Sequence, residues 1–313
     1  MSSFFYIRSA NKTFSDMSLP LFNRAKSSLC TCLPKYNINP YLGRCSHNCI
    51  YCYAIKFPSF NSPVTPRLNL KEEIFKIVKR TRTRLPVMLS DSTDPYQPLE
   101  RNYEITRRCI EALAENRFPI LIVTKSDLVV RDIDILKKTQ TVVSMTITTT
   151  RSDIARIIEP NAPEPNARFH ALKRIIDENI SAVVRIDPII PSINSDIKDL
   201  EKIVSKSSEI GVKQITASTM KIVRNLIPYI RHENPGLSKR LIDLYKDGEW
   251  IGSYKYLRRD IRRSILVGLK SIVEGYGLMF ATCREGFPDL NTTICDGTAY
   301  CRRTLNGFLT FKK

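Results

Sequence analysis

Apolar, β-branched runs recur along the middle of the chain, and amphipathic stretches separate them. The apolar runs cover residues 86–90, 119–126, 141–150, 181–190 and 213–222, and a last run covers residues 277–283. Between them, residues 103–117, 131–140, 167–180 and 195–210 place apolar positions at helical spacing, with charged residues on the other side. This alternation predicts strands that are connected by helices.

Strands that are connected by helices pair in parallel, because the right-handed crossover is the common way to join them. We therefore expect an α/β fold, a partial (β/α)6 barrel of the TIM type with a parallel sheet and with N- and C-terminal extensions. The expected division is an N-terminal extension over residues 1–35, the core barrel over 36–223, and a basic, helical, cysteine-containing region over 224–313 that packs on the core.

Polar residues stand where the apolar runs end, and functional groups of such folds lie at these carboxyl ends. They are Ser90, Asp91, Thr93, Asp94, Thr124, Lys125, Ser126, Arg185, Asp187, Ser218 and Thr219. We expect them to form one polar ring at the mouth of the barrel.

The sequence predicts a cytoplasmic protein with no membrane partner. It contains no run of 18 or more apolar residues, and its first residues lack the pattern of a signal peptide.

The chain carries 49 Lys and Arg against 31 Asp and Glu, a net charge of +18. This charge favours a polyanionic partner, DNA or RNA, although a general basic bias would give the same sign. One helical segment gathers arginines beside aromatic residues, as phosphate contact and base stacking require: Arg258, Arg259, Arg262 and Arg263 beside Trp250, Tyr254 and Tyr256. The alternative is a solvated helix face on which Asp260 and Glu249 pair with these arginines.

The nine cysteines fall into groups, which is typical of metal ligands in a large cytosolic chain. Cys109 stands apart on one helical face with Ile105 and Leu113, and we expect it to be a buried small hydrophobic residue. The others form three groups: Cys30 and Cys32; Cys45, Cys49 and Cys52; and Cys283, Cys295 and Cys301.

Cys45, Cys49 and Cys52 are separated by three and then two residues. Three thiolates hold three corners of a four-iron, four-sulfur (4Fe-4S) cluster and leave one iron open, whereas an electron-transfer cluster is fully capped by thiolates. An open iron can chelate the amino and carboxylate groups of S-adenosylmethionine (SAM), and one electron then releases a 5'-deoxyadenosyl radical. We expect Tyr51 to pack over the cluster. The alternative is a zinc site, which normally needs four ligands and would have to recruit His47 from inside the loop.

Several segments resemble the radical SAM superfamily and, within it, the spore photoproduct lyase-like (DNA repair photolyase-like) proteins. The resemblance covers about residues 30–301. The segments that carry it are NINPYLGRCSHNCIYCYA, LSDSTDPYQPLE, EITRRCIEAL, VTKSDLVVRDIDIL, RIDPIIP and FATCREGF.

The resemblance implies roles for five residues that are not cysteines. Thr93 and Asp94 would hold the amino group of SAM, Lys125 and Ser144 its carboxylate and ribose, and Asp187 would approach its adenine. It also implies a low-potential electron donor of the flavodoxin or ferredoxin type. A nucleic-acid lesion or tRNA base is the expected substrate, ahead of a small metabolite or peptide.

The chain departs from the family pattern at Asp91. In spore photoproduct lyase a cysteine at the matching position returns a hydrogen atom to the product radical. A carboxylate cannot do this, so we expect no repair of spore photoproduct by that route.

Cys283, Cys295 and Cys301 could form a second metal site, an auxiliary iron-sulfur cluster or a zinc site, that Cys30 or Cys32 completes. The spacing is not specific, and three separate thiols are the alternative.

A function of another class is a non-catalytic iron-sulfur protein, an electron carrier or a nucleic-acid-binding module. The missing fourth cysteine near the triad and the polar ring argue against it, because a carrier requires neither.

Overall fold

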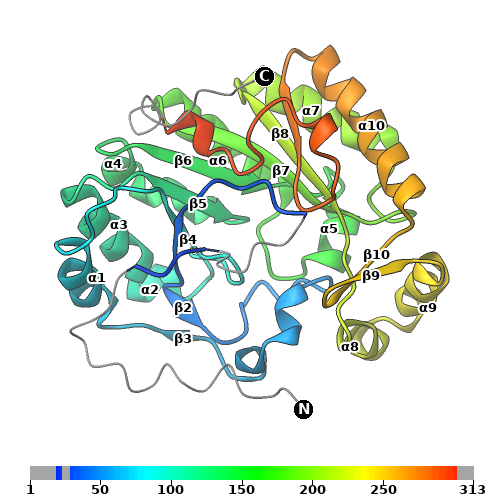
Figure 1. Cartoon of the computed structure of the whole chain (residues 1–313), viewed down its shortest axis with the longest axis horizontal. Coiled ribbons are helices and arrows are strands. Elements are labelled where there is room, and N and C mark those ends of the chain that lie inside the picture. Colours follow the sequence, from blue (N-terminus) through cyan, green and yellow to red (C-terminus); the bar gives the residue numbers. More distant parts are fainter. Residues whose placement is uncertain (1–18, 23–28, 302–313) are drawn as a thin grey trace.

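The computed structural model describes residues 19–22 and 29–301, and a seven-stranded parallel sheet forms its centre (Figure 1). The strand order is β1-β4-β5-β6-β7-β8-β11, so β1 and β11 are the edges of an open, partial barrel. The predicted α/β fold with a parallel sheet is thus confirmed. The strands are β1 (Tyr36–Ile38), β4 (Val87–Leu89), β5 (Ile120–Thr124), β6 (Thr141–Thr146), β7 (Ser181–Ile189), β8 (Gln214–Thr219) and β11 (Met279–Thr282).

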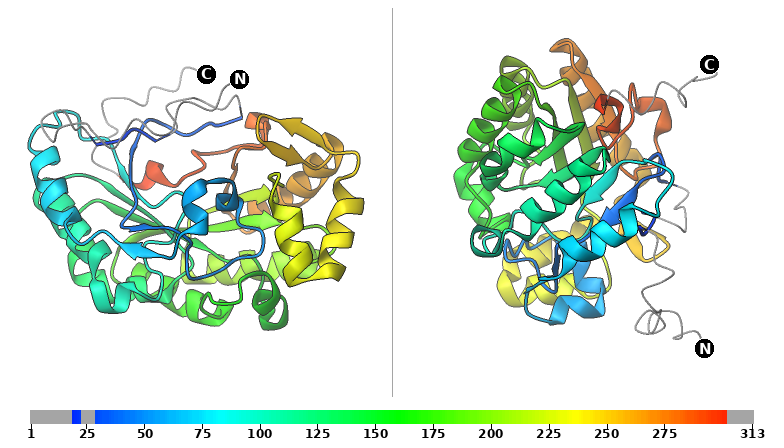
Figure 2. Two further views of the ribbon diagram at one scale, coloured as in Figure 1. Left: turned by 90° about the horizontal axis from the view of Figure 1, so that it is seen from below. Right: turned by 90° about the vertical axis from the view of Figure 1, so that its left-hand side faces the viewer.

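Helices cover the convex side of the sheet and leave the other side to the chain segments that form the site (Figure 2). The amphipathic character of the helices determines this placement, because each helix buries one apolar stripe against the strands. The helices of the barrel are α1 (Leu70–Val78), α2 (Glu100–Tyr103), α3 (Ile105–Glu115), α4 (Ile133–Leu136), α5 (Ser152–Ile158), α6 (Pro165–Asp177), α7 (Ile197–Ile210) and α10 (Arg259–Gly275).

The region over residues 224–313 was predicted to be helical, but its residues 249–256 form strands. After α8 (Leu226–Glu233) and α9 (Pro235–Tyr245), the chain forms a hairpin of β9 (Glu249–Ile251) and β10 (Tyr254–Tyr256). Gly252 takes a positive φ of 61° in the two-residue turn, which glycine favours in hairpins. A second small antiparallel pair joins β2 (Tyr41–Leu42) to β3 (Thr65–Pro66).

The concave side of the sheet is apolar in its lower half. Met88, Leu121, Val142 and Val183 form a cluster there with Cys301 from the end of the described chain. Met88 and Leu121 of this cluster also line the cavity at the carboxyl ends of the strands, so the cluster forms the apolar floor of that cavity.

None of the helices in the described part of the chain is long and apolar enough to cross a membrane.

Gly43 connects β2 to the loop that carries the cysteine triad. Its φ is +80°, and a Cβ atom at this position would lie 2.2 Å from the Pro63 carbonyl oxygen. We predict that Gly43→Ala destabilises the protein by about 1–3 kcal/mol, because a side chain strains both backbones. Urea unfolding of metal-free protein measures this change.

Gly268→Ala is the matched control. Gly268 is exposed in α10 and has no atom within 4 Å of its ideal Cβ position, so alanine should stabilise the helix by up to about 1 kcal/mol. Equal stability of Gly43→Ala and wild type would contradict the strain argument.

Candidate functional site

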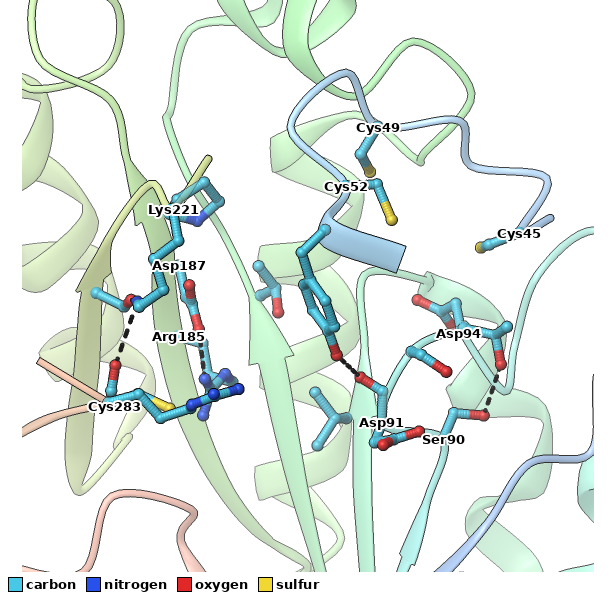
Figure 3. Close-up of a pocket in the computed structure, with 18 of the residues that line it drawn as sticks. Cys45, Cys49, Cys52, Ser90, Asp91, Asp94, Arg185, Asp187, Lys221 and Cys283 are labelled. Carbon is cyan, nitrogen blue, oxygen red and sulfur yellow. Dashed lines mark hydrogen bonds and ion pairs between the residues drawn. The ribbon is translucent and has the colours of Figure 1, made fainter. Parts of the chain in front are cut away.

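A cavity of about 950 Å³ opens at the carboxyl ends of the strands (Figure 3). All three cysteines of the triad line it on one side, and polar residues from the strand ends line it together with apolar side chains such as Met88, Leu121 and Phe57. The predicted site residues among them are Tyr51, Thr93, Asp94, Lys125 and Asp187. Ser144 is not part of the lining. It is fully buried on β6, and Thr146 is the hydroxyl-bearing residue of that strand which faces the cavity.

Hydrogen bonds to two other parts of the barrel fix the triad loop. The Ser46 N–H donates to the Gln97 side-chain oxygen at 3.0 Å, on the loop after β4. On the other side, the Ile50 N–H donates to the Ile158 carbonyl at 3.1 Å, and the Asn161 amide donates to the Ser46 carbonyl at 3.0 Å. The loop is therefore positioned by its neighbours independently of any bound group.

Burial governs the ionisation of the triad thiols. It raises the pKa of Cys45 and Cys52, and it raises the pKa of Cys49 to about 12 although the Lys125 ammonium opposes this. Thiolates, the ligating form, thus become favourable only when a cationic group binds among them.

His47 lies inside the triad loop, but both of its ring nitrogens face protein groups. Nδ1 lies 3.2 Å from the Asn161 carbonyl oxygen, and Nε2 lies 3.3 Å from the Asp94 carboxylate. In this position His47 is a link between the loop and β4, and its nitrogens are not directed at the thiols.

Asp94 is a buried carboxylate that accepts contacts from several segments. The Thr124 hydroxyl donates to Oδ1 at 2.7 Å, the Lys125 N–H to Oδ2 at 2.8 Å, and the Tyr96 N–H to Oδ1 at 2.9 Å. Burial disfavours the charged form, but His47 and these donors outweigh it and lower the pKa of Asp94 to about 2. Asp94 therefore joins β4, β5 and the triad loop as an ion.

Tyr51 and Lys125 stand next to each other beside Cys49. The Tyr51 hydroxyl donates to Glu159, which pairs with the buried Arg168 at 2.5 Å. The Lys125 ammonium lies 5.6 Å from the centre of the Tyr51 ring, a cation–π distance. Among the described residues, its side chain forms no hydrogen bond or ion pair, so its N–H donors are available to a ligand in the cavity.

Paired charges form the wall across the cavity from the triad, where Figure 3 shows Arg185, Asp187 and Lys221. Arg185 pairs with Asp187, and Lys221 pairs with the buried Glu285 at 3.0 Å. Burial alone would raise the pKa of Asp187, but Arg185 and Lys221 lower it. This wall presents fixed charges of both signs.

Aromatic and cationic residues also line the cavity, and the sequence analysis did not single out Tyr53, Lys56 or Arg284. The Lys56 ammonium lies 3.9 Å and the Arg284 guanidinium 4.7 Å from the centre of the Tyr254 ring. The Tyr53 and Tyr254 rings meet edge to face at 6.3 Å. We call Tyr53, Lys56, Tyr254 and Arg284 the aromatic wall. In the sequence, aromatic residues stand on both sides of Lys56 directly after the triad, and this pattern could have indicated the aromatic wall.

Comparison with known proteins identifies the family. The model of the radical SAM superfamily matches residues 39–206, more than half of the chain. The protein belongs to the radical SAM superfamily.

Similar proteins include characterised and uncharacterised ones. An uncharacterised protein of Methanocaldococcus jannaschii is 32% identical over 180 residues, which are 55% of this chain and 66% of that protein. A radical SAM Nα-GlyT isomerase of Pseudomonas phage M6 is 20% identical over 255 residues, 79% of this chain and 53% of that protein. This chain thus matches less than two thirds of the length of either relative.

The fold also resembles solved structures. A spore photoproduct lyase mutant with bound AdoMet and dinucleoside spore photoproduct superposes with a TM-score of 0.65 at 14% identity, over 79% of this chain and 75% of that one. This likeness confirms the radical SAM fold that the sequence predicted.

The arginine-rich helix of this radical SAM protein does not present the predicted surface, because Arg262 is buried. Its guanidinium pairs with Glu249 at 2.6 Å and with Glu285 at 3.1 Å. Arg258 pairs with Asp260, and Arg263 pairs with Asp289. The local pairing that was weighed as the alternative therefore describes this segment better. Tyr254 and Tyr256 are also buried, and of the three aromatic residues only Trp250 is exposed.

The C-terminal cysteines are also arranged differently from the expectation. Cys295 lies near Cys32, with 3.6 Å between the sulfurs, whereas Cys301 lies in the apolar lower half of the barrel. Among the described residues, no contact joins Cys301 to Cys283 or Cys295. Cys109 is fully buried, as predicted.

We predict that Asp94→Asn destabilises the metal-free protein by about 2 kcal/mol at neutral pH, because the pKa of Asp94 falls from 3.8 to about 2 on folding. A group with a lowered folded pKa stabilises the fold above its unfolded pKa. The difference between variant and wild type should therefore shrink as the pH falls from about 4 towards 2.

Denaturant unfolding at several pH values measures this. Asp91→Asn is the control, because the exposed Asp91 should change stability by less than about 0.5 kcal/mol. A pH-independent loss in Asp94→Asn would show that the ionised carboxylate is not the cause.

Proposed function

We propose that this radical SAM protein holds a 4Fe-4S cluster through Cys45, Cys49 and Cys52 and binds SAM in the adjoining cavity to abstract hydrogen from a nucleic-acid base or lesion. The position of the triad supports this proposal most directly. Its three thiols lie on one hydrogen-bonded loop and face the same cavity as the polar strand ends.

The residues present fit these groups. The three triad thiols line a cavity of about 950 Å³, and His47 of the same loop is turned to Asp94 and Asn161. When bound and reduced by a donor of the flavodoxin or ferredoxin type, the cluster and SAM supply a 5'-deoxyadenosyl radical.

The chain's own residues would orient SAM by charge. The unpaired Lys125 ammonium suits its carboxylate, and Thr93 with Asp94 stands where the family places its amino group. Asp187 would lie near the adenine. We assign the ribose contact of β6 to Thr146, which faces the cavity, in place of the predicted Ser144 beneath it.

Three features support a nucleic-acid substrate. The chain has a net charge of +18, and the aromatic wall places both rings and cations along the cavity, the residue types that stack on bases and contact phosphates. One structure of similar fold, a spore photoproduct lyase mutant, holds a dinucleoside spore photoproduct. Because Asp91 replaces the hydrogen-donating cysteine, the substrate would not be spore photoproduct treated by the lyase route.

We predict that anaerobically reconstituted protein with dithionite and SAM forms 5'-deoxyadenosine. Alanine at Cys45, Cys49 or Cys52 should reduce it to the level without enzyme, since each thiol holds one iron. Mass spectrometry of the nucleoside measures this. Cys109→Ala, a buried cysteine outside the cavity, should retain the activity. Wild type that binds iron yet forms no 5'-deoxyadenosine would instead support the electron-carrier alternative.

We also predict that the 5'-deoxyadenosine acquires deuterium when the reaction contains DNA or RNA from cells grown in heavy water. Transfer of deuterium reports abstraction from that polymer, and mononucleosides of the same origin serve as the control for a small substrate. If neither polymer labels the product while SAM is still cleaved, nucleic acid is not the substrate.

A further inference from the structure

Two cysteines from opposite ends of the described chain meet beside the cavity. Cys32 precedes β1, and Cys295 follows β11. Their sulfurs lie 3.6 Å apart, within reach of a thiol hydrogen bond, and the Thr31 hydroxyl donates to the Cys295 sulfur at 3.7 Å. Both cysteines line the cavity. The Cys295 sulfur is therefore directed at the N-terminal segment by two contacts.

Contacts outside the pair hold both segments in place. The buried Lys35 ammonium pairs with Asp296 at 2.7 Å and thereby ties the segment of Cys32 to the residue after Cys295. From β8, the Thr216 hydroxyl donates to the Cys295 carbonyl at 2.7 Å. Figure 2 shows the N-terminal segment beside the segment after β11. The fold itself thus brings the two thiols together, independently of any bound group.

The pair spans the opening of the barrel. β1 and β11 are the two edges of the seven-stranded sheet, and no strand pairing joins them in the described part of the chain. Cys32 and Cys295 stand next to these opposite edges in sequence and are 263 positions apart. A covalent bond between them would close the ring that the sheet leaves open.

The two thiols differ in exposure and in acidity. Cys32 is partly exposed, whereas Cys295 is only 1% exposed. The hydrogen bond with Cys295 is the main cause that lowers the pKa of Cys32, and the Lys35 ammonium adds to it, although burial opposes both. The pKa of Cys295 is raised by hydrogen bonds to Cys283 and Cys32. Cys32 is therefore the thiolate that a reagent in the cavity meets first, and Cys295 is the thiol behind it.

This geometry suits neither a metal site nor an existing disulfide. A zinc ion normally needs four ligands, and residues 19–22 and 29–301 contain no group of three or more candidate ligands. Both cysteines are free, and 3.6 Å exceeds the roughly 2.05 Å of a disulfide bond. A partly exposed thiolate with a second thiol in contact is the arrangement that thiol–disulfide exchange requires.

We propose that Cys32 and Cys295 are a redox-active pair that reacts with small disulfides and joins the two edges of the barrel by a reversible bond. The Cys32 thiolate attacks one sulfur of the small disulfide, forms a mixed disulfide and releases one thiolate. Cys295 then passes its proton to that thiolate, attacks the Cys32 sulfur and releases the second thiolate. The pair loses two electrons, and the small disulfide gains them.

The pair can be tested without a cluster or SAM, so its test is independent of the proposed function. Full-length, metal-free protein is equilibrated anaerobically with mixtures of reduced and oxidised glutathione. The samples are quenched with acid, their free thiols are alkylated, and the tryptic peptides are mapped by mass spectrometry without reduction. The forms compared are wild type, Cys32→Ser, Cys295→Ser and Cys301→Ser.

Cys301→Ser is the matched control. Cys301 is buried with Met88 and Val142 on the apolar floor of the cavity. Its replacement also removes the second cysteine from the tryptic peptide of Cys295, so the partner of Cys32 in that peptide is assigned without ambiguity.

In wild type and in Cys301→Ser, a linked Cys32–Cys295 peptide should replace the two alkylated peptides in parallel as the share of oxidised glutathione rises, and dithiothreitol should reverse this. Cys295→Ser should stop at a mixed disulfide of Cys32 with glutathione. Cys32→Ser should leave the buried Cys295 unmodified.

The urea midpoint gives a second readout. A bond that encloses so long a segment restricts the unfolded chain, so the oxidised wild type should unfold at a higher urea concentration than the reduced form. Glutathione bound to Cys295→Ser closes no ring and should give no such increase.

Three results would each overturn the proposal: a glutathione adduct that persists on Cys32 of the wild type, a bond from either cysteine to Cys30 or Cys283, and a Cys32 thiol that does not react. Circular dichroism identifies serine variants that fail to fold, and the peptide map of the wild type then decides alone. A triad that holds no cluster would leave all of these outcomes unchanged.

Discussion

The Asp94 carboxylate joins three segments at the mouth of the barrel, and the geometry of the cavity depends on this junction. An isolated carboxylate at so buried a position would be costly. Here it receives the His47 ring, the Thr124 hydroxyl and the Lys125 backbone N–H, so its charge is distributed over fixed donors. Because His47 belongs to the triad loop and Lys125 to the end of β5, the same ion sets the distance between the thiols and the cationic residue that faces them.

Charge pairing distinguishes the residues that build the cavity from those that remain available in it. Glu159 is paired with Arg168, and Asp187 is paired with Arg185. These pairs make rigid, nearly neutral walls. Lys125 differs, since its only described partners are a tyrosine ring and more distant charges. An anionic group entering the cavity would therefore be drawn to this side, next to the triad.

Much of the fold could be predicted from the sequence, because parallel strands buried on both faces leave long β-branched runs such as residues 181–190. Short elements could not be predicted in this way. β1 has three residues and no pattern of its own, and it is a strand because β4 and the N-terminal segment bind it. The hairpin at 249–256 was not predicted, because the segments on both sides of it have helical patterns and the strands themselves are only three residues long.

The residues of the candidate site likewise fall into those that the sequence predicts and those that only the fold reveals. The triad is local, so its spacing alone leads to the prediction of a cluster site, whereas contacts between remote residues left no periodic signal. Arg262 has the sequence context of a surface arginine, and only the fold reveals that it reaches inward to Glu285. Likewise, nothing in the spacing distinguishes Cys295 from Cys301, because their partners lie more than 100 residues away: Cys32 for the first, and strands β4 to β7 for the second.

The anchoring of the triad loop also determines when it can form during synthesis. Its hydrogen-bond partners Gln97, Ile158 and Asn161 are all translated after Cys52. The ribosome needs on the order of ten seconds to add the residues between Cys52 and Asn161. During that interval the nascent thiols have no enclosing barrel and are open to oxidants and to cluster-delivering proteins alike. The cluster proposed for the triad would then be inserted most easily before the barrel closes around the loop.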